Sequence, residues 1–180
     1  MTADLSDRAR RVRLLLFDVD GVLTDGKILL HADGTESKQF DIKDGTAIVL
    51  AQRGGLATGL LSARQSAATS ERATQLRIPI VRQGVGDKLK ALGEILAAER
   101  LTEDQVAYMG DDLLDVPVLG RVGLAAAPVD AVPEVRARVH WVSARRGGDG
   151  AARELVELVL KAQGRWDDLL AAWLEVPSRA

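Results

Sequence analysis

Six short segments of this 180-residue chain are apolar almost throughout, and they recur along most of its length. Because their residues do not alternate between apolar and polar, strands formed from them would be buried on both faces, as in parallel sheets. Helical patterns separate the segments, and 47% of all residues are hydrophobic, which is enough to cover both faces of a sheet. This alternation predicts an α/β fold: a doubly wound, Rossmann-like, mostly parallel sheet with helices on both faces. The apolar segments cover residues 12–17, 56–61, 78–81, 106–109, 122–126 and 139–142.

Residues 27–41 interrupt this alternation. They contain two extended-looking segments around Asp33-Gly34, a strong signal for a β-hairpin, which we place as a projection from the sheet. The tail, residues 164–180, carries a helical apolar stripe that needs a partner surface. We find no sign of a second domain, and we predict a single domain over residues 1–180. The stripe consists of Trp166, Leu169, Leu170, Trp173 and Leu174.

The composition excludes several classes of protein. The chain has no cysteine, so disulfides, thiolate metal sites and cysteine nucleophiles are ruled out. Its formal net charge of −2 lacks the basic excess that is typical of nucleic-acid binders. No apolar run approaches the roughly 20 residues of a membrane span, and residues 1–13 lack the apolar core of a signal peptide. We therefore expect a soluble, cytoplasmic protein without nucleic-acid or membrane partners.

Two carboxylates follow the first predicted strand. Asp18 and Asp20 are separated by one residue, so their side chains point the same way if the chain stays extended. Two carboxylates held together repel each other unless a cation or a shared proton relieves the repulsion, and hard oxygen ligands favour Mg²⁺. The alternative is an ordinary polar turn that closes the strand.

A second acidic cluster follows the fourth predicted strand. Asp111 and Asp112 come directly after Gly110, and Asp115 follows at helical spacing. One aspartate is expected here as a helix N-cap, whereas three acids together suggest a cation site. For Asp112 and Asp115 the structural and metal interpretations stay open, while Asp111 favours metal binding.

Two further polar residues stand where a phosphate could bind. Ser62 ends the second predicted strand and could hydrogen-bond a phosphate at the positive end of the next helix, or could simply cap that helix. Lys88 lies near the start of a predicted helix, where the helix dipole disfavours a cation unless an anion is present. Its alternative is a solvated lysine beside the cap Asp87. Because ligands of open α/β sheets bind at the carboxyl ends of the strands, all these residues are expected to meet at one edge.

The segments FDVDGVLTDG, LLSARQS, GDKL and GDDLLD resemble, in this order, the four motifs of the haloacid dehalogenase superfamily of phosphohydrolases. The resemblance implies that Asp18 is a nucleophile that forms an aspartyl phosphate. It implies that Asp20 first protonates the leaving alcohol and later accepts a proton from the attacking water. Ser62 and Lys88 would hold the phosphoryl oxygens.

The same resemblance implies a magnesium cofactor. Asp18, the backbone carbonyl of Asp20, and Asp111 would bind Mg²⁺. Asp112 would orient a metal-bound water from behind these ligands.

The chain is similar to the capless members of this superfamily, because the segment between Asp18 and Ser62 is too short for a folded cap domain. A closer similarity is to the 3-deoxy-D-manno-octulosonate 8-phosphate (KDO 8-phosphate) phosphatase family, through KQFDIKDG, GDDLLDVPVLGRVGLAAAPVDA and GGDGAARE. It implies hydrolysis of KDO 8-phosphate to KDO and phosphate, within KDO and lipopolysaccharide biosynthesis. It also implies a homotetramer formed through the hairpins, in which a neighbouring subunit helps to close each site.

Three residues are assigned to the sugar by this resemblance. Arg64 would meet the carboxylate of the sugar acid, and Asp44 and Thr46 would line the substrate site. Two positions depart from the family pattern, since Ala63 and Ala47 stand where glycines are usual. Both departures lie near the expected sugar and leave the phosphoryl-transfer residues intact.

Three other functions are compatible with parts of this pattern. The first is a capless phosphatase for another nonulosonate, such as a sialic acid 9-phosphate. The second is a phospho-aspartate receiver domain, but there the acidic pair follows the first strand and the phosphorylated aspartate lies in mid-chain, the reverse of the order here. The third is a non-catalytic interaction module, which the four intact motifs disfavour.

Overall fold

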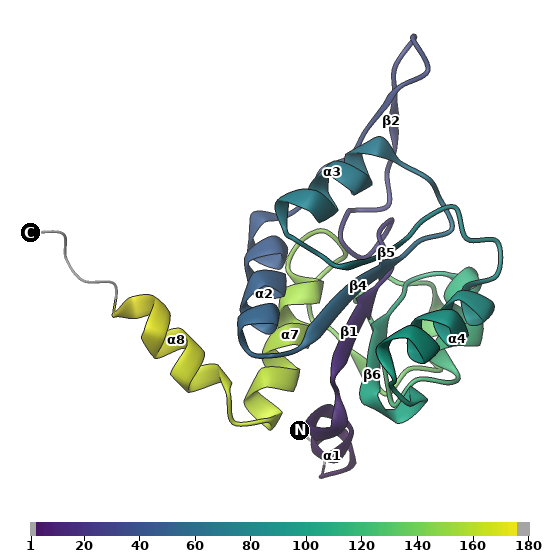
Figure 1. The fold of residues 1–180 in the computed structure, drawn as a ribbon. Helices are drawn as coiled ribbons and strands as arrows, with labels where there is room; N and C mark the ends of the chain where they lie inside the picture. The colour runs from purple at the N-terminus through teal and green to yellow at the C-terminus, as the bar shows by residue number, and fades with distance from the viewer. Residues whose placement is uncertain (1–2, 176–180) are drawn as a thin grey trace, which may run out of the picture.

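The computed structural model describes residues 3–175, and its centre is one parallel sheet. The six strands are arranged in the order β5-β4-β1-β6-β7-β8 (Figure 1). Each predicted apolar segment overlaps one of these strands, so the predicted α/β fold with a mostly parallel sheet is confirmed. The strands are β1 (Leu14–Phe17), β4 (Ala57–Leu61), β5 (Ile80–Arg82), β6 (Val106–Met109), β7 (Leu124–Ala127) and β8 (Trp141–Val142).

Helices cover both faces of the sheet, because every strand residue of β1 is buried and successive side chains point to opposite faces. Leu15 and Phe17 belong to one core, and Leu14 and Leu16 belong to the other. In Figure 1, α2 and α7 lie to one side of the sheet and α4 to the other. The first core is covered by α1 (Ala3–Arg11), α2 (Ile42–Arg53), α3 (Ala67–Gln75) and α7 (Ala151–Ala162), and the second by α4 (Lys88–Glu99), α5 (Val116–Leu119) and α6 (Pro133–Arg136).

The order of the strands determines where a ligand can bind. β1 pairs with β4 on one side and with β6 on the other. After β1 the chain continues on the α2 side of the sheet, whereas α4, which leads into β6, lies on the opposite side. Such a reversal leaves a crevice beyond the carboxyl ends of the central strands. Two 3₁₀ turns, η1 (Glu103–Gln105) and η2 (Leu113–Asp115), flank β6.

The predicted hairpin is present and projects away from the sheet (Figure 1). Its strands β2 (Leu29–Leu30) and β3 (Glu36–Ser37) are antiparallel and only two residues long. The turn is closed by Asp33, whose carboxylate accepts a hydrogen bond from the backbone N–H of Thr35 at 2.9 Å. Leu29 and Leu30 are 62% and 70% exposed, so the hairpin presents an apolar surface to solvent.

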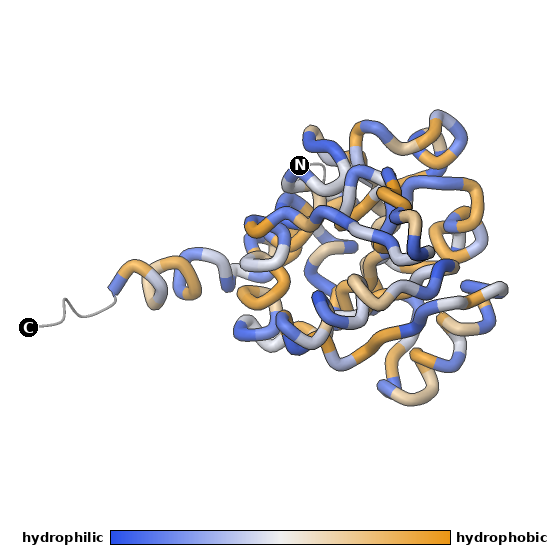
Figure 2. Tube along the Cα trace, turned by 90° about the horizontal axis from the view of Figure 1, so that it is seen from above, coloured by the Kyte–Doolittle hydropathy of each residue, from blue (hydrophilic) through white to orange (hydrophobic). Residues whose placement is uncertain are grey.

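The tail forms a helix, α8 (Trp166–Leu174), that extends from the body of the molecule. Figure 2 shows its mixed hydrophobic and hydrophilic residues far from the centre. Trp166 and Leu169 pack against the first core, whereas Leu170, Trp173 and Leu174 are exposed. The predicted stripe is therefore only half covered by its own chain. No helix within residues 3–175 has the length and apolar character needed to cross a bilayer.

Candidate active site

A cavity of about 210 Å³ lies at the carboxyl ends of β1, β4 and β6. It collects the residues that the sequence placed at separate strand ends, together with parts of the loop after β1. Its lining consists of Asp18, Asp20, Gly26, Ser62, Ala63, Arg64, Lys88, Asp111, Asp112 and Leu114.

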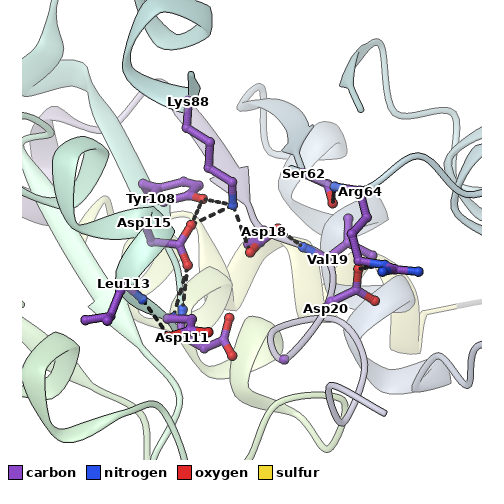
Figure 3. Close-up of polar contacts among 12 residues, drawn as sticks. Asp18, Val19, Asp20, Ser62, Arg64, Lys88, Tyr108, Asp111, Leu113 and Asp115 are labelled. Atoms are coloured by element: carbon purple, nitrogen blue, oxygen red, sulfur yellow. Dashed lines mark hydrogen bonds and ion pairs between the residues drawn. The ribbon is translucent and has the colours of Figure 1, made fainter. Parts of the chain in front are cut away.

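Asp18 and Lys88 form a buried ion pair at this cavity (Figure 3). Asp18 is the first residue after β1, and its Oδ2 lies 2.9 Å from the Lys88 Nζ. Its Oδ1 accepts a hydrogen bond of 2.7 Å from the backbone N–H of Val19. Lys88 is the first residue of α4, where Asp87 is the N-cap and accepts from the N–H of Lys90. Both alternatives for this segment are thus partly realised: Asp87 caps the helix, and Lys88 meets an anion.

Asp115 holds the lysine and the acidic loop together. Its Oδ1 accepts hydrogen bonds from the Lys88 Nζ at 2.7 Å and from the Tyr108 hydroxyl at 2.6 Å. Its Oδ2 accepts from the backbone N–H groups of Asp111 at 2.9 Å and Asp112 at 3.2 Å. Because both oxygens are fully engaged, the geometry favours the structural interpretation of Asp115. Tyr108 is fully buried within β6, and no sequence pattern distinguishes it from the other residues of that apolar strand.

Asp111 is the residue best placed to receive a metal ion. Carboxylate oxygens of Asp18, Asp111 and Asp115 all lie within 4.8 Å of one another. The Oδ1 of Asp111 is buried and has no hydrogen-bond partner within the described residues 3–175. Leaving a buried acceptor unpaired is costly, and a cation would satisfy it. Gly21, at φ +85°, leaves room for the Asp111 carboxylate beside the loop after β1, because a Cβ at position 21 would overlap that carboxylate. The residues present therefore fit a divalent cation.

The electrostatics of the cluster agree with this fit. Burial, and next the charge of Asp115, raise the pKa of Asp18 to about 6, although Lys88 opposes the shift. Burial, followed by the charges of Asp18 and Asp115, raises the pKa of Asp111 to about 8. The single ammonium group of Lys88 does not neutralise the carboxylates around it. A divalent cation would remove the remaining repulsion.

Asp20 lies apart from this cluster, at the rim. Figure 3 shows its side chain directed toward Arg64, whereas that of Asp18 is directed toward Lys88. The Nζ of Lys38 lies 2.7 Å from the Asp20 Oδ1 and 2.9 Å from its Oδ2. Arg64 contributes its Nε at 3.7 Å from Asp20 and a 2.8 Å contact to Glu36. Lys38 and Glu36 were not predicted to lie at this site, because no local pattern shows which way a hairpin residue faces.

Ser62 and Asp112 line the cavity and also make local hydrogen bonds. Ser62 follows β4, is 2% exposed, and its Oγ accepts from the N–H of Arg64 at 3.3 Å. Asp112 is exposed and accepts from the N–H of Leu113 at 2.7 Å. Both residues thus combine a local structural contact with a position open to a ligand.

Asp44 and Thr46 do not line this cavity. Asp44 is buried in the first turn of α2, and its carboxylate accepts hydrogen bonds from the N–H groups of Gly150 at 3.2 Å and Arg153 at 2.8 Å. It therefore caps the start of α7, although burial raises its pKa to about 6. The hydroxyl of Thr46 donates to the carbonyl of Ile42 at 3.0 Å. A role of these two residues in substrate binding stays a prediction.

Comparison with known proteins gives consistent matches. Residues 58–155 match the model of the haloacid dehalogenase-like hydrolases. A 3-deoxy-D-manno-octulosonate 8-phosphate phosphatase from Yersinia pestis is 40% identical over 162 residues, covering 90% of this chain and 87% of the relative.

Solved structures agree. A probable yrbi family phosphatase from Pseudomonas syringae superimposes with a TM-score of 0.94 at 43% identity, covering 97% of this chain and 99% of that one. A 3-deoxy-D-manno-octulosonate 8-phosphate phosphatase from Moraxella catarrhalis, in complex with magnesium, phosphate and KDO, superimposes with a TM-score of 0.93. It is 32% identical, and the match covers 96% of this chain and 99% of that one.

Proposed function

This chain belongs to the haloacid dehalogenase-like hydrolases, as a phosphoric monoester hydrolase of the 3-deoxy-D-manno-octulosonate 8-phosphate phosphatase family, and from that premise we propose that it hydrolyses KDO 8-phosphate to KDO and phosphate. The observation that carries the proposal is the cluster of Asp18, Lys88 and Asp111 at one cavity. It combines a buried carboxylate, a cation 2.9 Å away and an unpartnered carboxylate oxygen.

In the proposed first step, an Asp18 oxygen attacks the phosphorus atom while the bond from phosphorus to the sugar oxygen breaks. The Asp20 carboxyl gives its proton to the departing sugar oxygen, which leaves as the alcohol. Lys88 and Ser62 hold the phosphoryl oxygens, and Asp115 and Tyr108 keep the Lys88 ammonium in place. The product of the step is an aspartyl phosphate on Asp18.

In the second step, a water attacks the phosphorus atom and its proton passes to the Asp20 carboxylate. The bond between phosphorus and the Asp18 oxygen breaks, and phosphate leaves. Mg²⁺ would be held by Asp18, the backbone carbonyl of Asp20, and Asp111, with Asp112 behind them, and when bound it supplies positive charge to the phosphoryl oxygens.

Arg64 is the group proposed to recognise the sugar acid. It stands at the rim of the cavity with its side chain 48% exposed and its guanidinium already bound to the carboxylate of Glu36. An arginine fork matches a carboxylate in geometry and charge, so a sugar carboxylate can take the place of Glu36.

We further propose a single domain over residues 1–180 that assembles as a homotetramer. Two apolar surfaces of the described chain support assembly: Leu29 and Leu30 on the hairpin, and the exposed face of α8. Contiguous exposed apolar groups of this kind usually mark interfaces between proteins.

The test is phosphate release by the purified protein from KDO 8-phosphate and from a sialic acid 9-phosphate, side by side. We expect turnover of KDO 8-phosphate with Mg²⁺, none with excess chelator, and recovery when Mg²⁺ is restored. Faster turnover of the sialic acid ester would instead identify the protein as a sialic acid 9-phosphate phosphatase. Full activity in chelator would refute the metal role.

A further inference from the structure

The hairpin delivers one buried lysine, Lys38, to the active site, and none of the roles inferred from the sequence motifs belongs to it. The side chain of Lys38, which follows β3, is 0% exposed. A buried ammonium group loses its hydration, so it needs a close anionic partner. Its Nζ contacts both oxygens of Asp20, at 2.7 and 2.9 Å.

Lys38 makes the shortest ionic contacts of the Asp20 carboxylate. Within residues 3–175, Arg64 offers the Asp20 carboxylate only a longer contact, at 3.7 Å. The backbone of the same loop is held independently, by hydrogen bonds from the N–H groups of Leu23 and Thr24 to the carbonyl of Val19. Lys38 is therefore not needed to hold the loop, but it fixes the carboxylate that the loop carries.

Glu36 does not compete strongly for the lysine. Its carboxylate lies 3.8 Å from the Lys38 Nζ, whereas it lies 2.8 Å from the Arg64 guanidinium. Each cation of this group thus has its own short anionic contact: Lys38 has Asp20 and Arg64 has Glu36. Arg64 therefore balances the charge of Glu36, and Lys38 pairs with Asp20.

From these contacts we propose that Lys38 is a positioning residue that holds the carboxylate of Asp20 for its two proton transfers. The inference rests on the proposed function, in which Asp20 protonates the leaving alcohol and then accepts a proton from water. Through Lys38, the position of the hairpin sets the orientation of a side chain in the active site. If the hairpins assemble the protein, assembly and proton transfer are mechanically linked.

A first experiment compares two esters. The sugar of KDO 8-phosphate is a poor leaving group that needs a proton, whereas 4-nitrophenolate leaves without one. We expect Lys38→Met to lower kcat on the sugar ester about 10- to 100-fold, part of the usual contribution of a general acid, with little change in KM. With 4-nitrophenyl phosphate we expect a rapid burst of nitrophenolate, close to one per active site, followed by slow turnover. The burst arises because Asp20 is still needed for the second step.

The matched control is Lys43→Met. Lys43 is also a lysine next to the hairpin, but it is 57% exposed and pairs with Asp41 and Asp149 at the surface. The Lys43→Met variant should retain the activity of the unmodified protein on both esters. Lys38→Arg keeps the charge and should recover part of the lost kcat, which also guards against a Lys38→Met protein that fails to fold.

A double-mutant cycle separates positioning from anchoring. If Lys38 acts through Asp20, replacing it in an Asp20→Asn background should cause no further loss in either step. The same fold-loss in both backgrounds, or equal losses on both esters without a burst, would overturn the inference and leave Lys38 as an anchor of the hairpin. An unmodified protein that hydrolyses only 4-nitrophenyl phosphate would instead contradict the proposed substrate, and the burst would still test Lys38.

Discussion

At the scale of single residues, the active site brings together groups that are costly to bury. Asp18 and Asp111 stand beside Asp115, and within the part of the chain that the structure describes Lys88 is the one cation paired with this cluster. Charged groups arranged in this way have strongly shifted pKa values, which are typical of functional sites. Burial and mutual repulsion of these carboxylates lower the stability of the fold, and the same two effects shift their pKa values.

Asp18→Asn tests the proposed nucleophile. An amide oxygen is a poor nucleophile toward phosphorus, so turnover of KDO 8-phosphate should fall below detection while the fold persists. Phosphate release and circular dichroism measure the two effects. The substitution also removes one of the repelling charges, so the metal-free protein should lose no stability. Turnover near that of the unmodified protein in a folded Asp18→Asn variant would sink the mechanism.

The pH dependence of metal binding follows from the raised pKa values. The folded pKa of Asp111, about 8, and that of Asp18, about 6, exceed the ordinary value of 3.8. The folded metal-free protein therefore retains protons that the unfolded chain releases, and its stability falls as pH rises from about 4 through 6 to 8. Mg²⁺ requires the ionised carboxylates, so its affinity should rise over pH 6 to 8.

Calorimetric unfolding with and without Mg²⁺ checks this sign. The increase in unfolding temperature caused by Mg²⁺ should be larger at pH 8 than at pH 6. Asp111→Asn is the control: it should lose most of the response to Mg²⁺ and part of the fall in stability between pH 6 and pH 8, because an amide neither ionises nor carries the charge that attracts the cation. A response to Mg²⁺ that is independent of pH would contradict the assignment.

At the scale of elements, the hairpin is distinctive because it projects apolar side chains from strands too short to support themselves. Two-stranded hairpins are marginal in water unless they pack against something else. Leu29 and Leu30 lie in the unsupported part, whereas Lys38 lies where the hairpin joins the body. This arrangement suits an element in which strand β2 contacts a second chain while the base of the hairpin positions a side chain in the active site.

The double substitution Leu29→Ser and Leu30→Ser tests the proposed assembly. Both side chains are exposed, so the fold of one chain should be unaffected, but the protein should dissociate to a smaller species. Light scattering after size exclusion gives the mass. Leu89→Ser is the matched control, because Leu89 is a partly exposed leucine on α4, outside both proposed interfaces. An unchanged tetramer mass in the hairpin variant would rule out this interface.

At the scale of the whole molecule, the strand-end residues could be predicted to meet because topology alone brings them together. The ends of β1, β4 and β6 are adjacent once the sheet is parallel, so Asp18, Ser62 and Asp111 converge from distant parts of the chain. Lys38 and Tyr108 could not be predicted in this way. Their roles depend on how a hairpin folds back and on which strand residue faces an aspartate, and no periodicity encodes either feature.

The exposed face of α8 also belongs to this scale, because its leucines Leu170 and Leu174 are 40% and 75% exposed and could contact a second chain. Leu170→Ser with Leu174→Ser keeps the contacts of Trp166 and Leu169 with the core. If α8 helps to close a neighbouring site, KM for the sugar ester should rise several-fold while turnover of 4-nitrophenyl phosphate is unchanged. Steady-state kinetics on both esters decide this. Equal kinetics for the variant and the unmodified protein would show that α8 does not contribute to the site.

The placement of Asp18 at the end of β1 and Asp111 at the end of β6 has a kinetic consequence. These two strands are neighbours in space but are far apart in sequence, so the site does not exist until they pair. If they pair after the rate-limiting barrier, a metal ion can retain the folded state but cannot guide the chain toward it. Mg²⁺ should then slow unfolding in denaturant and leave the refolding rate almost unchanged. Metal binding at the active site would thus stabilise the folded state without speeding its formation.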